Sequence, residues 1–193
     1  NRAVMKAIKD EGSKPTYVAQ SDKFDWGGAK WTILNPPKDQ FGDFESQAGN
    51  LSIVYLLEFN GKRLLFTGDI EPNVADRIAD ELKPHLDGKR VSVFLMTHHG
   101  ANSSSSKKLD QLIRPWWVVI SAGKDNDYHH PHKNAVNRLK AIDGATIWCT
   151  PTNGTVTVRI NAGGDISWTA SGTLKAPWWS GHEKVQHGKC NEF

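Results

Sequence analysis

The chain has 193 residues, of which 23% are charged and 38% hydrophobic, and it carries a formal net charge of +3 at pH 7. That length fits a single domain with a sizeable core, and no apolar run approaches the roughly 18 residues of a membrane-spanning helix. Two cysteines, Cys149 and Cys190, are too few for a disulfide scaffold, so we expect a soluble protein of a reducing compartment, the cytoplasm. The small positive charge permits an anionic substrate without indicating a protein that coats nucleic acid.

The first third of the chain predicts one helix and then antiparallel strands. Val4 and Ile8 lie about one helical turn apart and Gly12 stands where a helix would stop, so residues 1–11 are expected to be helical. Asn60-Gly61 is the strongest short-range hairpin signal, and it predicts that the strands before and after it pair. The strands expected here cover residues 16–19, 30–34, 51–59 and 62–67, with a polar loop over 38–49.

The rest of the chain alternates between helical spacing and short apolar runs. Pro72 opens a helix whose apolar stripe includes Ile78 and Leu82. The serines of residues 103–106 predict the start of a second helix, because serine is a preferred N-cap. The remaining expected elements are strands 91–96 and 116–120, a helix over 134–142, and a closing meander of strands 146–149, 155–160 and 165–169. This alternation predicts a layered α/β domain.

Three of the apolar runs end abruptly in polar residues of the kinds that bind metals. One run stops at Asp69, the next stops at His98 and His99, and the third leads through a short loop to His130. In α/β sheets, side chains beyond the carboxyl ends of parallel strands meet at one rim. Imidazole and carboxylate together suit a borderline divalent ion such as zinc or manganese.

Each of these pieces also has a simpler explanation. A Gly-Asp pair after a strand is commonly only a turn, and two adjacent histidines are a weak signal. The serines of residues 103–106 most simply cap a helix, although a free helix start also holds phosphate oxygens. The coincidence of the three strand ends is what favours a metal or phosphate site.

These segments give the chain a resemblance to a known family. They are similar, in the same order, to segments of the metallo-β-lactamase-like domain of the ComEC/Rec2 competence proteins and their free-standing relatives. The matching segments are Asn50–Val54, Leu64–Asp69, His98–Gly100, Ser121–Gly123 and Asn126–Pro131. The resemblance implies an α/β fold, a metallo-β-lactamase-like αββα sandwich of which this chain holds the C-terminal two-thirds. It also implies hydrolysis assisted by one or two divalent metal ions.

The resemblance implies roles for individual residues as well. Asp69, His98 and His130 would be metal ligands. His98 and His99 would provide a ligand or a proton donor to the leaving group, and the sequence leaves open which histidine does which. The substrate-binding residues expected from the matching segments and the serine-rich helix start are Asn50, Ser52, Ser104, Ser105 and Asn126.

The chain departs from the family pattern in two places. It contains no His-x-His-x-Asp-His segment, the family's main metal cradle, and His129 stands where relatives often have glycine before His-Pro. We therefore expect an N-terminal portion to precede Asn1, and little hydrolysis by this chain alone. We divide the chain into an N-terminally incomplete domain over residues 1–170 and a tail over 171–193. His182, His187 and Cys190 could form a small metal cluster there, but an exposed or docked tail is the favoured interpretation.

The favoured function is a metal-dependent hydrolase of phosphodiesterase or nuclease type, acting on a phosphodiester such as DNA. One alternative is a non-catalytic domain that binds a partner or nucleic acid. Another is a metal-dependent ester hydrolase, because one fold supports several substrates. The sequence does not predict an oligomeric state.

Overall fold

The computed structural model describes residues 2–40 and 48–172 of the chain. Within these residues seven strands form one sheet, in which the spatial order of the strands follows their order in the sequence. The strands are β1 (Lys23–Trp26), β2 (Ala29–Asn35), β3 (Val54–Phe59), β4 (Lys62–Phe66), β5 (Val93–Leu95), β6 (Trp117–Ile120) and β7 (Thr146–Cys149). Strands β1 to β4 pair antiparallel, whereas β4 to β7 pair parallel.

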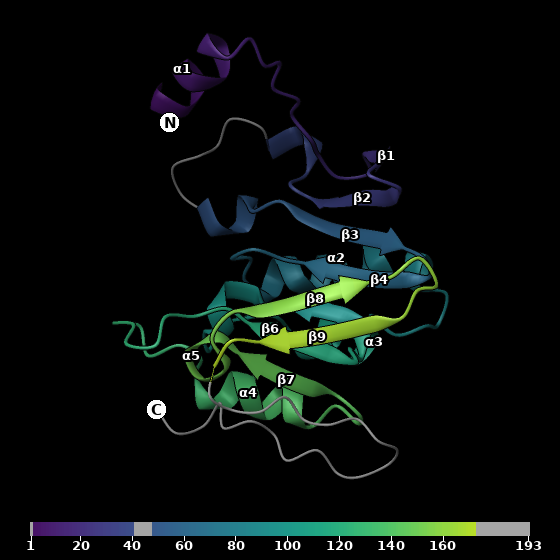
Figure 1. Ribbon diagram of the computed structural model, residues 1–193, viewed down its shortest axis with the longest axis vertical. Coiled ribbons are helices and arrows are strands. Elements are labelled where there is room, and N and C mark those ends of the chain that lie inside the picture. The colour runs from purple at the N-terminus through teal and green to yellow at the C-terminus, as the bar shows by residue number, and fades with distance from the viewer. Residues whose placement is uncertain (1, 41–47, 173–193) are drawn as a thin grey trace.

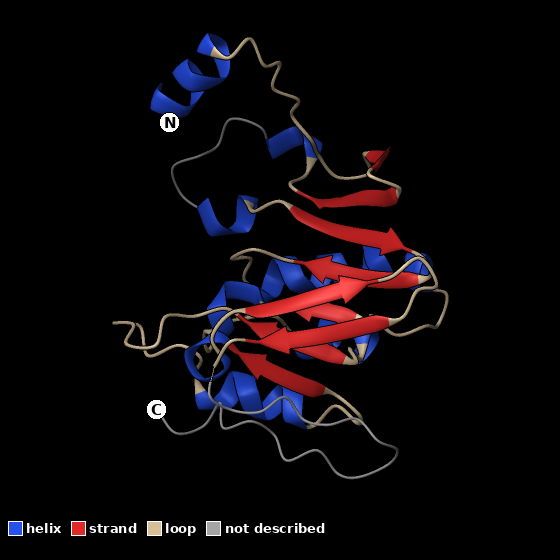
Figure 2. Cartoon of the chain, viewed as in Figure 1, coloured by secondary structure: helices blue, strands red, loops and turns tan. Residues whose placement is uncertain are grey.

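Helices cover one face of this sheet, and a β-hairpin covers part of the other face (Figures 1 and 2). The hairpin is the separate two-stranded sheet of β8 (Val156–Ile160) and β9 (Ile166–Ala170). The helices are α1 (Arg2–Asp10), α2 (Pro72–Leu86), α3 (Lys107–Ile113), α4 (Lys133–Lys140) and α5 (Thr150–Asn153), with the short 3₁₀ helices η1 (Lys38–Gln40), η2 (Ala48–Leu51) and η3 (Thr97–Gly100). Helix α1 has no buried residue and extends away from these layers (Figure 1). Among the described residues, no helix has the length and apolar character needed to cross a bilayer.

Side chains that alternate along each strand point to the two opposite faces of the seven-stranded sheet. In β6 the buried Val118 and Ile120 belong to the main core, which they share with buried residues of α2, α3 and α4. Trp117 points to the opposite face, where its ring centroid lies 5.5 Å from that of Trp168 in β9. Because successive side chains of a strand point to opposite faces, one short strand joins the helix layer to the hairpin layer.

Most of the predicted elements are present. The predicted α/β class is confirmed, and the hairpin at Asn60-Gly61 joins β3 to β4 in an antiparallel pair. The helix expected at Pro72 buries Ile78 and Leu82, and Ser106 caps α3 by accepting a hydrogen bond from the Leu109 amide at 3.0 Å. The boundaries of most expected strands shift by only one to a few residues.

Three expectations about the fold were wrong. Residues 16–19 form no strand; the segment is held by local bonds such as that from the Ala19 amide to Asp22 Oδ2 at 2.8 Å. Strand β7 does not pair with β8, because α5 intervenes and β7 joins the main sheet beside β6. Cys149 is buried and disulfide-bonded, whereas the reducing compartment expected from the cysteine count predicts a free thiol. The expectations for residues 41–47 and 173–193, including His182, His187 and Cys190, lie outside the described residues.

Candidate active site

The candidate site lies beyond the carboxyl ends of β4, β5 and β6, three neighbouring parallel strands. Hydrogen bonds tie the first two strand ends together: the Thr97 hydroxyl donates to the Thr67 hydroxyl at 2.9 Å, and Thr67 Oγ1 donates to the Leu95 carbonyl at 3.0 Å. The His98 amide donates to the Gly68 carbonyl at 2.9 Å. The chain on both sides of these contacts is thereby fixed, which places Asp69 next to η3.

The third strand end is joined to η3 through the loop between β6 and α4, which projects beyond the sheet (Figure 1). The His132 amide donates to the Gly100 carbonyl at 2.9 Å. Gly100 has a φ of +79°, and a Cβ there would lie 2.7 Å from Pro131 Cβ and 3.3 Å from Ile120 Cγ2. Only glycine permits both this backbone conformation and this close approach. The absence of a side chain at Gly100 is therefore what lets His130 lie near His98 and His99.

His98 and His99 both adopt left-handed backbone conformations, with φ values of +47° and +54°. Such values are uncommon for residues other than glycine and concentrate at functional sites. His99 Nδ1 lies 2.6 Å from the Ser121 carbonyl, and His99 Nε2 lies 3.6 Å from Asp69 Oδ1. Because a carbonyl oxygen only accepts hydrogen bonds, Nδ1 carries a proton, and Nε2 is the nitrogen available for chemistry.

His98 and His130 complete a group of rings around this pair. The ring centroid of His130 lies 5.8 Å from that of His98 and 6.3 Å from that of His99. Burial lowers the pKa of His130, and the nearby rings of His132, His98 and His99 lower it further, whereas Asp69 opposes them. These influences favour the neutral imidazole at His130. His98 Nδ1 is buried and has no hydrogen-bond partner among the described residues.

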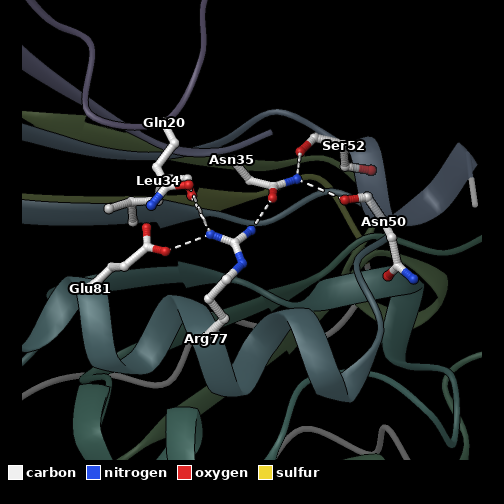
Figure 3. Close-up of polar contacts among 7 residues, drawn as sticks. All are labelled: Gln20, Leu34, Asn35, Asn50, Ser52, Arg77 and Glu81. Carbon is white, nitrogen blue, oxygen red and sulfur yellow. Dashed lines mark hydrogen bonds and ion pairs between the residues drawn. The ribbon is translucent and has the colours of Figure 1, made fainter. Parts of the chain in front are cut away.

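A hydrogen-bond network behind Asp69 fixes its loop. Ser52 Oγ accepts from the Asp69 amide at 3.0 Å, and Asn50 Oδ1 accepts from the Glu71 amide at 2.9 Å. The Asn35 side-chain amide donates to the carbonyls of Asn50 and Ser52, and Arg77 of α2 donates to Asn35 Oδ1 (Figure 3). Asn50 and Ser52, predicted to bind substrate, thus hold the Asp69 loop in this structure, and their contact with substrate stays a prediction.

Asn126 fixes the loop between β6 and α4 in the same way, through hydrogen bonds to its backbone. Its Nδ2 donates to the carbonyls of Gly123 and His130 at 2.8 and 2.7 Å, and its Oδ1 accepts from the His130 amide at 2.8 Å. Both ends of the carboxamide are therefore used to hold the backbone of His130. Substrate binding by Asn126 stays a prediction, but the structure gives it a positioning role that its sequence position did not indicate.

The serines after η3 are buried and not displayed to solvent. Ser104 and Ser105 are 0% and 2% exposed. The Ser105 hydroxyl donates to Asp110 Oδ1 at 2.7 Å, and the Ser104 carbonyl accepts from Arg138 Nη2. Ser104 and Ser105 thus contact the protein itself, and substrate binding by them stays a prediction.

Comparison with curated proteins finds relatives that match most of this chain. ComE operon protein 3 of Bacillus subtilis is 27% identical over 156 residues, which are 81% of this chain and 19% of that protein. Recombination protein 2 of Haemophilus influenzae is 28% identical over 167 residues, 86% of this chain and 19% of that protein. The chain's homologues are competence proteins of the ComEC/Rec2 family. The predicted resemblance is thereby confirmed, and the chain spans about a fifth of the length of the curated relatives it matches.

Two other comparisons add less. No protein-family model matches the chain. Among solved structures, a proposed zinc-dependent hydrolase of the metallo-β-lactamase superfamily from Thermotoga maritima is 14% identical, with a TM-score of 0.41, over 68% of this chain and 61% of that protein. A likeness at this level does not assign a function.

The ComEC/Rec2 resemblance implies divalent metal ions, and the side chains present offer suitable nitrogen and oxygen donors. Within residues 2–40 and 48–172, however, no group of three or more His, Cys, Asp or Glu side chains is arranged to hold a metal ion. His99 lies next to Asp69. Binding of a metal ion by Asp69, His98 and His130 stays a prediction.

Several residues that build the candidate site were not predicted from the sequence. Thr67 and Thr97 lock two strand ends, and the Ser121 carbonyl sets the tautomer of His99. Their position as the first polar residues after an apolar strand was an available signal. Nothing in the sequence indicated which neighbour each would contact.

Proposed function

We propose that this chain forms part of the active site of a hydrolase that cleaves phosphodiester bonds, with DNA as the leading substrate. A divalent ion, zinc or manganese, would bind only when further ligands join the side chains described above. The observation that carries the proposal is the His99 ring, held by the Ser121 carbonyl with Nε2 3.6 Å from Asp69 Oδ1. The relatives' names, competence protein and recombination protein, support a nucleic-acid substrate.

His99 is arranged to act as a general acid. Its Nδ1 proton is engaged by Ser121, so a second proton would be carried on Nε2, beside the Asp69 carboxylate. In hydrolysis, water attacks phosphorus, the bond from phosphorus to the leaving oxygen breaks, and that oxygen takes the Nε2 proton. Asp69 stabilises the charged ring before transfer, and the carbonyl of Ser121 keeps Nε2 directed outward.

The test is hydrolysis of bis(p-nitrophenyl) phosphate and of a single-stranded oligonucleotide by the full-length gene product that contains this chain, with added manganese or zinc. His99→Gln and Asp69→Asn are each expected to lower kcat/KM by about 100-fold or more, the usual scale for a positioned proton donor. Asp69 and His99 side chains are about half exposed, so both variants are expected to fold, which circular dichroism checks. His85→Gln, a histidine change in α2, is the matched control and should leave turnover unchanged. Unchanged turnover in His99→Gln and Asp69→Asn would reject the proposal.

A second candidate function is binding of nucleic acid without hydrolysis. It is favoured by the lack of an assembled metal group among the described residues. A gene product that binds the oligonucleotide but hydrolyses neither phosphodiester at any metal concentration supports this alternative. Turnover of p-nitrophenyl acetate in place of the phosphodiesters supports the ester hydrolase instead.

A further inference from the structure

A pocket of about 290 Å³ adjoins the candidate site. It is lined by His99, Tyr128 and His130, by Asn126 and by the turn of residues 121–123. The proposed proton donor therefore forms one wall of the pocket. Any group that enters the pocket lies against the position where the leaving oxygen would be protonated.

The polar groups of the turn are already engaged with other parts of the protein. The Ser121 carbonyl accepts from His99, and the Gly123 carbonyl accepts from Asn126 at 2.8 Å. The Ala122 amide and carbonyl both bond to the Thr150 hydroxyl, at 2.9 and 2.8 Å. Because these groups have partners, the turn offers a ligand few directed hydrogen bonds, and recognition in this pocket depends on ring faces and apolar contact.

Tyr128 provides the most accessible of these ring faces. Its residue is 75% exposed, and its ring lies at 24° to that of His130, with 5.7 Å between centroids. The His130 and His99 rings are also nearly parallel, at 23°. The rings of His99, His130 and Tyr128 thus form a row in which neighbouring rings are inclined by 23° and 24°. An exposed tyrosine at the end of such a row provides a surface for a flat ligand.

We propose that this pocket binds an unpaired nucleobase of a phosphodiester strand next to the bond that is cleaved, and that Tyr128 is the residue on which the base stacks. The inference rests on the proposed function. A base fits because every base has a π face and stacking on an aromatic side chain needs no directed hydrogen bond. A paired base has its faces covered by its neighbours in the duplex, so the pocket favours single strands and tolerates any sequence.

Binding of a fluorescein-labelled oligothymidylate, measured by anisotropy with EDTA present, tests this without requiring turnover. Tyr128→Ala is expected to weaken binding roughly 5- to 150-fold, the range that corresponds to one lost base–aromatic stack. Tyr128→Trp should restore it. Tyr17→Ala, at a tyrosine that is 72% exposed on the N-terminal segment, is the matched control and should bind as the unchanged protein does.

A scan with one abasic site moved along the oligonucleotide decides whether the lost contact is to a base. An abasic site at one position of the oligonucleotide should weaken binding to the unchanged protein by about the factor expected for Tyr128→Ala. The same abasic site should leave binding to the Tyr128→Ala protein unaffected. Equal effects of every abasic position on both proteins, or normal binding by the Tyr128→Ala protein, would overturn the stacking inference and leave the proposed hydrolase untouched. A complete lack of strand binding would overturn both the inference and DNA as the substrate.

Discussion

Asn126 holds His130 by its backbone, with Nδ2 donating to the His130 carbonyl and Oδ1 accepting from the His130 amide. Three hydrogen bonds depend on this one side chain, because Nδ2 also donates to Gly123. A side chain that holds the backbone of a predicted metal ligand should affect turnover more than binding, since small displacements of such groups are costly.

Asn126→Ala is accordingly expected to lower kcat by about 10- to 100-fold with little change in KM, and to cost roughly 1 to 3 kcal/mol of stability. Steady-state kinetics and urea unfolding measure the two effects, and the NMR signals of the His130 ring should shift. Asn137→Ala, at an exposed asparagine of α4, is the control. An Asn126→Ala protein with a raised KM and unchanged kcat would show that Asn126 binds substrate, as the sequence predicted.

At the scale of elements, η3 and the loop before α4 approach each other closely at Gly100. A methyl group at Gly100 would meet Pro131 and Ile120, and its φ of +79° strains any other residue. Gly100→Ala is therefore expected to move the two segments apart, to destabilise the protein by about 2 to 4 kcal/mol and to lower kcat/KM.

The variant Gly27→Ala separates the effect of backbone strain from the effect of a steric clash. Gly27 has a φ of +62°, but a Cβ there meets nothing within 4 Å. Gly27→Ala should lower the free energy of unfolding by only about 1 to 2 kcal/mol and leave turnover unchanged. Thermal unfolding and kinetics of the two variants make the comparison; equal effects in both would show that the contact with Pro131 is unimportant.

The elements also show what sequence patterns predict. Asn60-Gly61 gave the correct hairpin because both strands lie next to the turn that sets their register. Asn153-Gly154 carries the same signal, yet Asn153 Oδ1 accepts from the Cys149 amide and closes the short helix α5. A turn signal describes the backbone at the turn, whereas strand pairing depends on contacts with distant residues.

The candidate site was likewise predictable from the sequence only in part. Parallel strands that end in polar residues predicted that Asp69, one or both of His98 and His99, and His130 come together. The structure brings Asp69, His99 and His130 together. The choice between His98 and His99 was not predictable, because both residues leave the strand in left-handed conformations that no alternation pattern describes. Their roles as ligands or acids stay predictions.

At the scale of the whole molecule, the helix layer contains a buried carboxyl group that links folding to pH. Asp110 of α3 is 3% exposed, accepts from the Ser105 hydroxyl at 2.7 Å and lies 3.5 Å from Arg138 Nε of α4. Burial raises the pKa of Asp110 above its ordinary 3.8, although Ser105 and Arg138 both act to lower it. The folded protein therefore holds this proton more tightly than the unfolded chain does.

Stability from this group is consequently present below pH 3.8 and is lost as the pH rises from there through the folded pKa, the reverse of the usual carboxylate. Asp110→Asn keeps the Ser105 contact and cannot ionise. The free energy of unfolding of the variant minus that of the unchanged protein should therefore increase as the pH rises across this window, then level off. Urea unfolding between pH 3.5 and 7 measures the difference, and Asp80→Asn, at an exposed carboxylate paired with Lys108, should show no such increase. A difference that falls with rising pH would mean that the Arg138 ion pair outweighs burial, and that the helix layer is held together by this charge pair.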